Sequence, residues 1–110
     1  MLAAVEEAKE AAVSAVPNPR GHARPLAEAL FEFEQRLHEA RERMASWRGG
    51  GPERAACEHG LDESLRRAEA LRIGAPELTY ESLLAEIAEL IDPLEPFEAA
   101  ARVERGSSES

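Results

Sequence analysis

Cysteine, aromatic residues and long apolar runs are scarce in this sequence of 110 residues. The single cysteine, Cys57, excludes a disulfide framework within the chain and a zinc site built from cysteines alone, which is compatible with a reducing cytoplasm. No apolar run approaches the roughly 20 residues that span a bilayer. Residues 1–16 carry charges such as Glu6 and Lys9 where a signal peptide needs an uninterrupted apolar region, so we expect a retained segment and a cytoplasmic protein.

Basic charge is also in short supply, and the formal net charge is −9. Binding to nucleic acid or to an anionic membrane relies on basic surface, so we expect neither of these partners and favour a protein partner. No Lys or Arg lies between Arg72 and Arg102, whereas this stretch holds Glu77, Glu81, Glu86, Glu89, Asp92, Glu95 and Glu98. These acids form either the solvated face of a helix or a surface that recruits a basic partner.

Motifs that carry catalysis or bind cofactors are missing from the sequence. The Glu-x-x-His spacing of helical di-metal sites fails at His38, which has Gln35 three residues before it. The segment Cys57-Glu58-His59 lacks the second ligand pair of a zinc motif, so Cys57 is better explained as a small apolar core residue. We therefore predict no catalytic residue, metal ligand or cofactor, and an enzyme is the less favoured class.

Apolar residues at helical spacing are what the sequence does have. Steps of four and three, typical of a helix that buries one face, connect Leu26, Leu30, Phe33, Leu37, Ala40, Met44 and Trp47. Pro25 suits the first turn of this helix, and the glycines at 49–51 end it after about 24 residues, which would make it the longest element. The composition is rich in Ala, Glu, Leu and Arg, which are strong helix formers.

Three further segments show helical patterns. The segment 2–16 has a weak stripe of Ala and Val, and Pro17 ends it. A third helix is predicted over 53–74, or from Leu61 onward, because Gly60 costs about 1 kcal/mol in a helix interior. Thr79 can cap a fourth helix, whose wide apolar face comprises Tyr80, Leu83, Leu84, Ile87, Leu90, Ile91 and Leu94.

These segments predict an all-α fold, a single helical bundle of three main antiparallel helices with short accessory helices at both termini. The expected domain spans residues 1–105, with 1–16 as a loosely docked helix. A brief last helix is expected around Phe97–Val103 and a disordered tail at 106–110.

The packing features favour a noncatalytic protein-interaction or self-assembly module, with a homodimer as one form of it. Phe31 lies outside the main stripe and either packs on the first helix or contacts a partner. Charged residues on the two sides of the main stripe help to determine which helix packs against it. The interaction candidates are therefore Leu30, Phe31, Leu37, Met44 and Trp47, with the flanking residues Arg36 and Arg43.

Two alternatives stay open. In the first, the bundle binds a small ligand or catalyses a reaction in a cavity between helices, lined by Trp47, Tyr80, His38 and Cys57. In the second, the chain is an acidic regulator that binds a basic protein.

Overall fold

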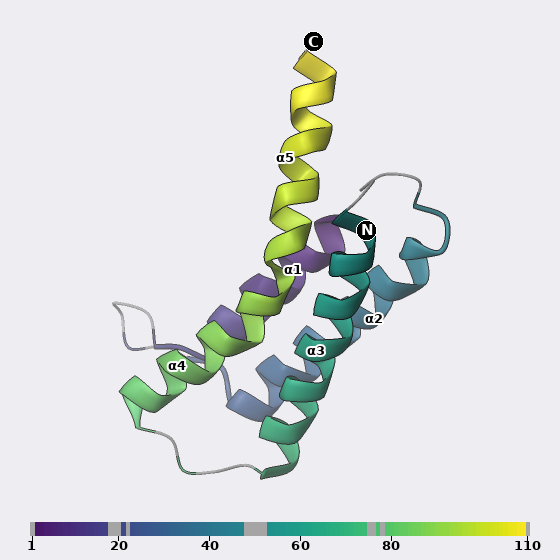
Figure 1. Cartoon of the computed structure of the whole chain (residues 1–110). Coiled ribbons are helices and arrows are strands. Elements are labelled where there is room, and N and C mark those ends of the chain that lie inside the picture. The colour runs from purple at the N-terminus through teal and green to yellow at the C-terminus, as the bar shows by residue number, and fades with distance from the viewer. Residues whose placement is uncertain are drawn as a thin grey trace.

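The computed structural model, shown in Figure 1, describes residues 2–17, 21, 23–47, 53–74, 77 and 79–109, with side chains up to residue 102. The regular elements in this part of the chain are all helices, which confirms the all-α class. They are α1 (Leu2–Val13), α2 (Leu26–Met44), α3 (Glu53–Gly74), α4 (Tyr80–Ile91), the 3-10 helix η1 (Asp92–Leu94) and α5 (Glu95–Glu109). The glycine break predicted at residues 49–51 lies outside the described residues.

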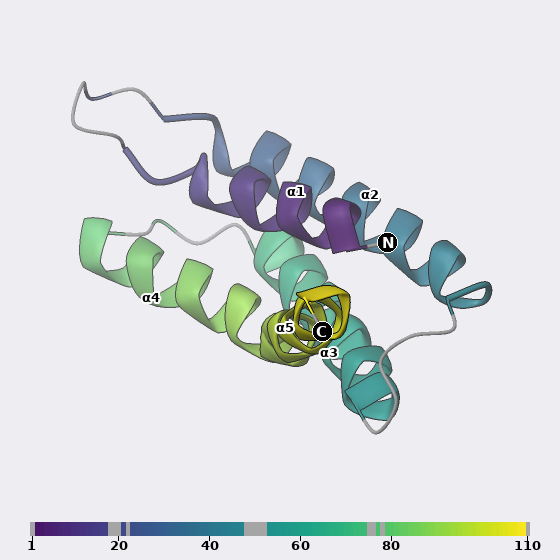
Figure 2. The same cartoon turned by 90° about the horizontal axis from the view of Figure 1, so that it is seen from above.

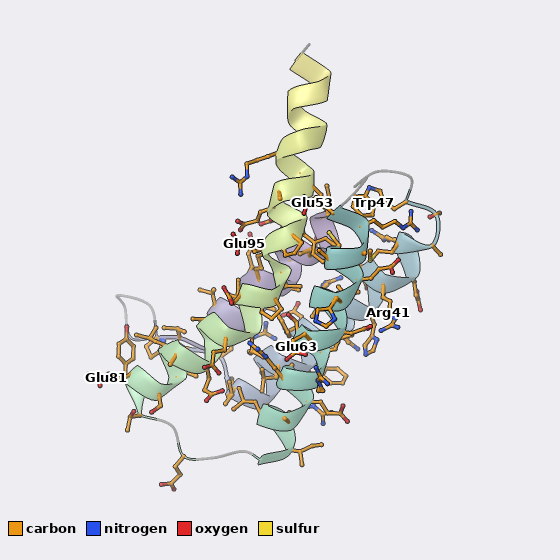
Figure 3. The ribbon with its side chains drawn as sticks, viewed as in Figure 1. Arg41, Trp47, Glu53, Glu63, Glu81 and Glu95 are labelled. Carbon is orange, nitrogen blue, oxygen red and sulfur yellow. The ribbon has the colours of Figure 1, made fainter. Side chains whose placement is uncertain are left out.

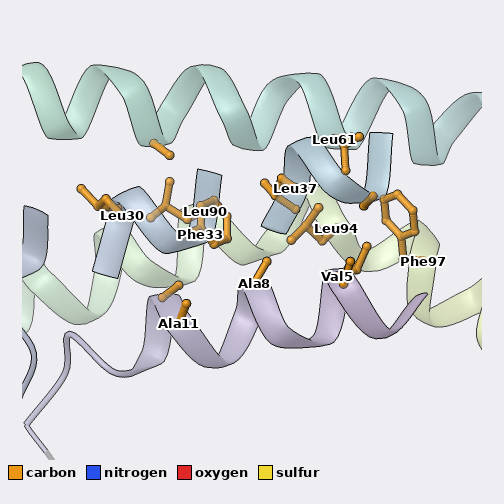
Figure 4. Packing of buried hydrophobic residues seen from close by; sticks show 14 of the residues in the cluster. Val5, Ala8, Ala11, Leu30, Phe33, Leu37, Leu61, Leu90, Leu94 and Phe97 are labelled. Carbon is orange, nitrogen blue, oxygen red and sulfur yellow. The ribbon is translucent and has the colours of Figure 1, made fainter. Parts of the chain in front are cut away.

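Helices α1 and α3 both pack on α2, and both run antiparallel to it (Figures 1 and 2). The predicted stripe of α2 is buried at Leu30, Phe33, Leu37, Ala40 and Met44, and it is partly buried at Leu26 and Trp47. Figure 4 shows Leu30, Phe33 and Leu37 in the core between α1 and α3. The three-four spacing therefore predicted the buried face correctly.

Helix α1 is docked along its whole length, whereas the sequence analysis expected a loosely docked accessory helix. Its buried face is made of Ala4, Val5, Ala8, Ala11 and Ala12. These side chains are short, so the α1 backbone can approach α2 closely and fill the space that longer side chains would occupy. Helix α1 is therefore part of the core, and the chain is not divided into three main helices and two accessory ones.

Helix α3 runs through Gly60 without interruption and covers 22 residues, against 19 for α2. Both the alternative start at Leu61 and the prediction that the second helix is the longest are therefore wrong. Gly60 is buried against η1, and a Cβ built on it would overlap the Pro93 carbonyl oxygen and lie 3.0 Å from the carbonyl carbon. The missing side chain lets η1 pack directly on the α3 backbone.

Helix α4 begins as predicted, because the backbone N–H of Ser82 donates to Thr79 Oγ1 at 3.1 Å. At its other end the carbonyl of Glu89 lacks a donor within the helix, since Pro93 has no N–H. Arg67 Nη1 donates to that carbonyl at 2.8 Å. Ser64, one turn earlier on α3, is fully buried and donates from Oγ to the carbonyl of Leu90, also at 2.8 Å.

Helix α5 follows η1 almost directly and is longer than the brief last helix that the sequence predicted. Phe97 and Ala100 are buried near the start of α5. Lys9 of α1 binds the α5 residue Glu98, with Nζ 2.9 Å from Oε1. The sequence predicted a disordered tail at 106–110, whereas α5 extends to Glu109.

Candidate interaction surface

Three of the predicted contact residues lie in the core of this chain. Leu30, Leu37 and Met44 are at most 3% exposed, because the α2 stripe faces α1 and α3. Trp47 is half-buried just beyond α2 and packs against the same core (Figure 3). Arg54 of α3 holds this end of α2 by donating to the carbonyls of Met44, at 2.8 Å, and of Trp47. Leu30, Leu37 and Met44 therefore hold the chain together and are not on its surface.

Arg36 and Glu34, on the two flanks of the α2 stripe, form ion pairs within the chain. On one flank, Arg36 Nε lies 3.4 Å from Glu7 Oε2 of α1. On the other flank, Arg72 Nε of α3 lies 3.1 Å from Glu34 Oε2. These flanks therefore select α1 and α3 as the partners of α2. Arg43 is exposed, and its side chain forms no ion pair with any described residue.

Phe31 is 57% exposed on the outer face of α2, so it does not pack on α1 as the sequence analysis allowed. It borders an open hollow together with Arg24 and Arg72. Both arginines are paired, the first with Glu32 and the second with Glu34. Phe31 is therefore an exposed apolar side chain, and the described cations that border the same hollow are already paired.

The four cavity candidates are not brought together. Cys57 is buried in α3, His38 is exposed on α2, Tyr80 is exposed at the start of α4, and Trp47 follows α2. Burial, followed by the charges of Glu53 and Glu58, raises the pKa of the Cys57 thiol to about 11. The thiol is thus protonated and unreactive near neutral pH. Within the described residues, no group of three or more His, Cys, Asp or Glu side chains is placed to hold a metal ion.

The apolar residues of α4 are more numerous than its neighbours can cover. Ile87 and Leu90 are buried, and Leu83 and Ile91 are partly buried. In contrast, Tyr80 is 57% exposed and Leu84 is 41% exposed. Figures 1 and 2 show the reason, since α4 diverges from α3 toward its own N-terminus and leaves that end free.

The free end of α4 lies beside the C-terminal end of α1 (Figure 2), where Val13 is 52% exposed. We call Val13, Tyr80 and Leu84 together the α1–α4 surface. Val13 was missed at the sequence level because it fits the helical stripe of residues 2–16. The signal that could have indicated exposure is the width of the α4 apolar face, which is broader than one helix buries in a small bundle.

An open hollow of about 720 Å³ extends along α1 from Val13, with Val16 and Pro17 in its apolar part. Two cations also line it, Lys9 and Arg24, and both are paired, with Glu98 and Glu32 respectively.

Two acidic residues at this surface are uncompensated. Glu10 lines the hollow, and Glu81 lies on the free end of α4 (Figure 3). The side chains of these two residues form no ion pair or hydrogen bond within the described structure. The α1–α4 surface is therefore apolar with a net acidic edge.

The described helices include none with both the length and the apolar character that crossing a membrane requires. Comparison with known proteins gives no relative, since no protein-family model, curated protein or solved structure matches this chain.

Proposed function

We propose that this chain is a noncatalytic protein-interaction module that binds its partner through the α1–α4 surface. The observation that carries the proposal is the exposure of Tyr80 and Leu84, one turn apart on α4, beside the end of α1 at which Val13 is also exposed (Figure 2). Scattered apolar side chains on a surface are normal, but apolar side chains gathered together beside polar ones are typical of interaction sites.

The use of the other helix faces supports the same conclusion. The apolar stripe of α2 is covered by α1 and α3, and the flanking residues Arg36 and Glu34 pair with residues of those helices. The proposed compartment is a reducing cytoplasm, since Cys57 is a free and buried thiol.

Site-specific photo-crosslinking in cells that express the chain tests this function. A benzophenone amino acid replaces Leu84 in one variant and Glu42, an exposed residue of α2, in the control. We expect a discrete crosslinked protein from position 84 and none of the same mass from position 42. Identical products from both positions, or no product from position 84, would overturn the proposal.

Self-assembly through α2 is a second candidate, favoured by the 57% exposure of Phe31. Light scattering across a concentration series measures the mass of the assembly directly. A homodimer should have twice the 12.0 kDa mass of the chain, and Phe31→Ser should return it to the monomer. A monomer at all concentrations would exclude this candidate.

A further inference from the structure

We infer that the α1–α4 surface takes a basic amphipathic segment of another protein. This inference rests on the proposed function and adds the chemistry of the partner. It joins two observations, the exposed apolar side chains and the unpaired acidic side chains beside them.

The charges at the edge of the surface determine the sign of the charge that the partner should carry. Lys9 and Arg24 are the described cations around the hollow, and each is paired with a glutamate of its own chain. Glu10 and Glu81 have no such partner among the described residues. Because both described cations are paired and these two carboxylates are not, a basic segment gains charge complementarity with the described edge and an acidic one is repelled.

The apolar side chains decide that the segment is amphipathic. A purely basic peptide would leave Tyr80 and Leu84 in water, whereas a segment with one apolar face covers them. An amphipathic helix that lays its apolar face into a groove is a recurring mode of recognition. Such a helix would place its apolar face over these side chains and its cations near Glu10 and Glu81.

A second copy of this chain fits the surface less well. Sequence positions 73–101 contain no Lys or Arg, so two α4 helices packed on each other would bring acidic residues together. On α2, Arg36 is already paired with Glu7 and Glu39. Among the described α2 residues of a second copy, Arg43 is the one arginine left unpaired, whereas a foreign basic segment supplies several cations.

Binding of synthetic peptides tests the inference. The probe is a fluorescent 18-residue peptide of Leu and Lys in heptad order. One control peptide has Glu in place of Lys, and a second has the same Leu and Lys composition in scrambled order. We expect the ordered Leu/Lys peptide to bind best, with Kd rising roughly tenfold between about 50 and about 300 mM salt, because the charges are exposed. Equal binding of the Glu peptide, or binding insensitive to salt, would overturn the inference.

Two pairs of variants locate the binding on the molecule. Leu84→Ser should raise Kd for the ordered peptide about fivefold by removing apolar contact, whereas Phe31→Ser should leave Kd unchanged. Glu81→Gln should raise Kd and reduce its salt dependence, whereas Glu42→Gln should do neither. All four positions are wholly or largely on the surface, and circular dichroism checks that each variant keeps its helices. An equal effect of Phe31→Ser and Leu84→Ser would overturn the inference.

The two proposals fail in different ways. If position 84 crosslinks a protein in cells while peptide binding ignores Leu84, the interaction surface stands and the basic partner is wrong. If light scattering shows a dimer that Leu84→Ser converts to a monomer, the occupant is a second copy and the inference is overturned. If position 84 crosslinks nothing, the proposed function itself fails.

Discussion

Gly60 of α3 lies directly against the carbonyl of Pro93 in η1, with no space between them for even a methyl group. Pro93 also ends the hydrogen-bond ladder of α4, because it has no N–H for the carbonyl of Glu89. Arg67 and Ser64, on the same helix as Gly60, donate to the carbonyls of Glu89 and Leu90. The same stretch of α3 thus has two roles. Gly60 makes room for Pro93, and Arg67 donates the hydrogen bond that Pro93 cannot donate, while Ser64 donates to the next carbonyl.

Gly60→Ala should destabilise the chain by about 2 kcal/mol or more, measured as the free energy of unfolding in urea. Helix propensity alone would favour Ala by about 1 kcal/mol, but overlap with the Pro93 carbonyl forces the backbone of η1 to shift. The control is Ala56→Gly at an exposed position of α3, which measures propensity without the overlap. A Gly60→Ala variant more stable than the parent chain would contradict the close packing.

Arg67→Met should lower the free energy of unfolding by about 1 kcal/mol more than Arg66→Met does. A hydrogen bond from a charged group to a partly exposed carbonyl contributes about that much to stability. Both arginines pair with Glu63, but Arg67 also donates to the carbonyl of Glu89. Comparison of the two urea unfolding curves therefore isolates the bond to α4. If the two variants unfold at the same urea concentration and with the same slope, Arg67 does not hold the end of α4.

Thr79→Ala should lower stability by about 1 kcal/mol, because the N–H of Ser82 loses its acceptor. Thr79→Ser keeps a hydroxyl at the cap and should retain most of the stability. Helix α4 has a free end, so we expect the loss to show first as faster hydrogen exchange of its N-terminal amides. Unchanged exchange in Thr79→Ala would mean that the cap does not limit the fraying of α4.

Local chemistry explains which parts of the fold could be predicted. The N-cap at Thr79 depends on residues three apart, and the α2 stripe depends on a period that the sequence shows directly. The role of Gly60 depends on Pro93, which is remote in sequence. The sequence shows the local cost of this glycine in a helix but not the packing that requires it.

The candidate surface was harder to predict for a related reason. Periodicity shows that Val13, Tyr80 and Leu84 belong to apolar faces, but it does not show how much of each face a neighbouring helix covers. That coverage depends on the divergence of α4 from α3, which is a property of tertiary packing. The sequence alone leaves Tyr80 open as a cavity residue, whereas in the structure it lies on an exposed helix end.

Stability should fall with acid partly through Glu98, because the hydrogen bond and then the charge of Lys9 lower the pKa of this carboxyl below its ordinary value of 4.5. The ion pair therefore stabilises the chain fully above pH 4.5 and is lost as the pH falls through the lower pKa of the folded state. Glu98→Gln should flatten this part of the profile of unfolding free energy against pH. Glu42→Gln is the control. An equal flattening in that variant would show that the effect comes from the net charge of the chain and not from the pair of Lys9 and Glu98.

Cys57 should react with iodoacetamide about 100-fold more slowly than an ordinary thiol at pH 8, because a pKa of about 11 in place of 9.0 leaves that much less thiolate. Burial in α3 slows the reagent further, so modification should proceed through opening of the helix. Mass spectrometry of timed samples measures the rate, and the same chain in urea provides the rate of the exposed thiol. Since Gly60 lies one turn away on α3, Gly60→Ala should accelerate the reaction by loosening this packing. A parent chain that reacts as fast without urea as with it would show that Cys57 is not held in the core, and would place this part of α3 outside the stable fold.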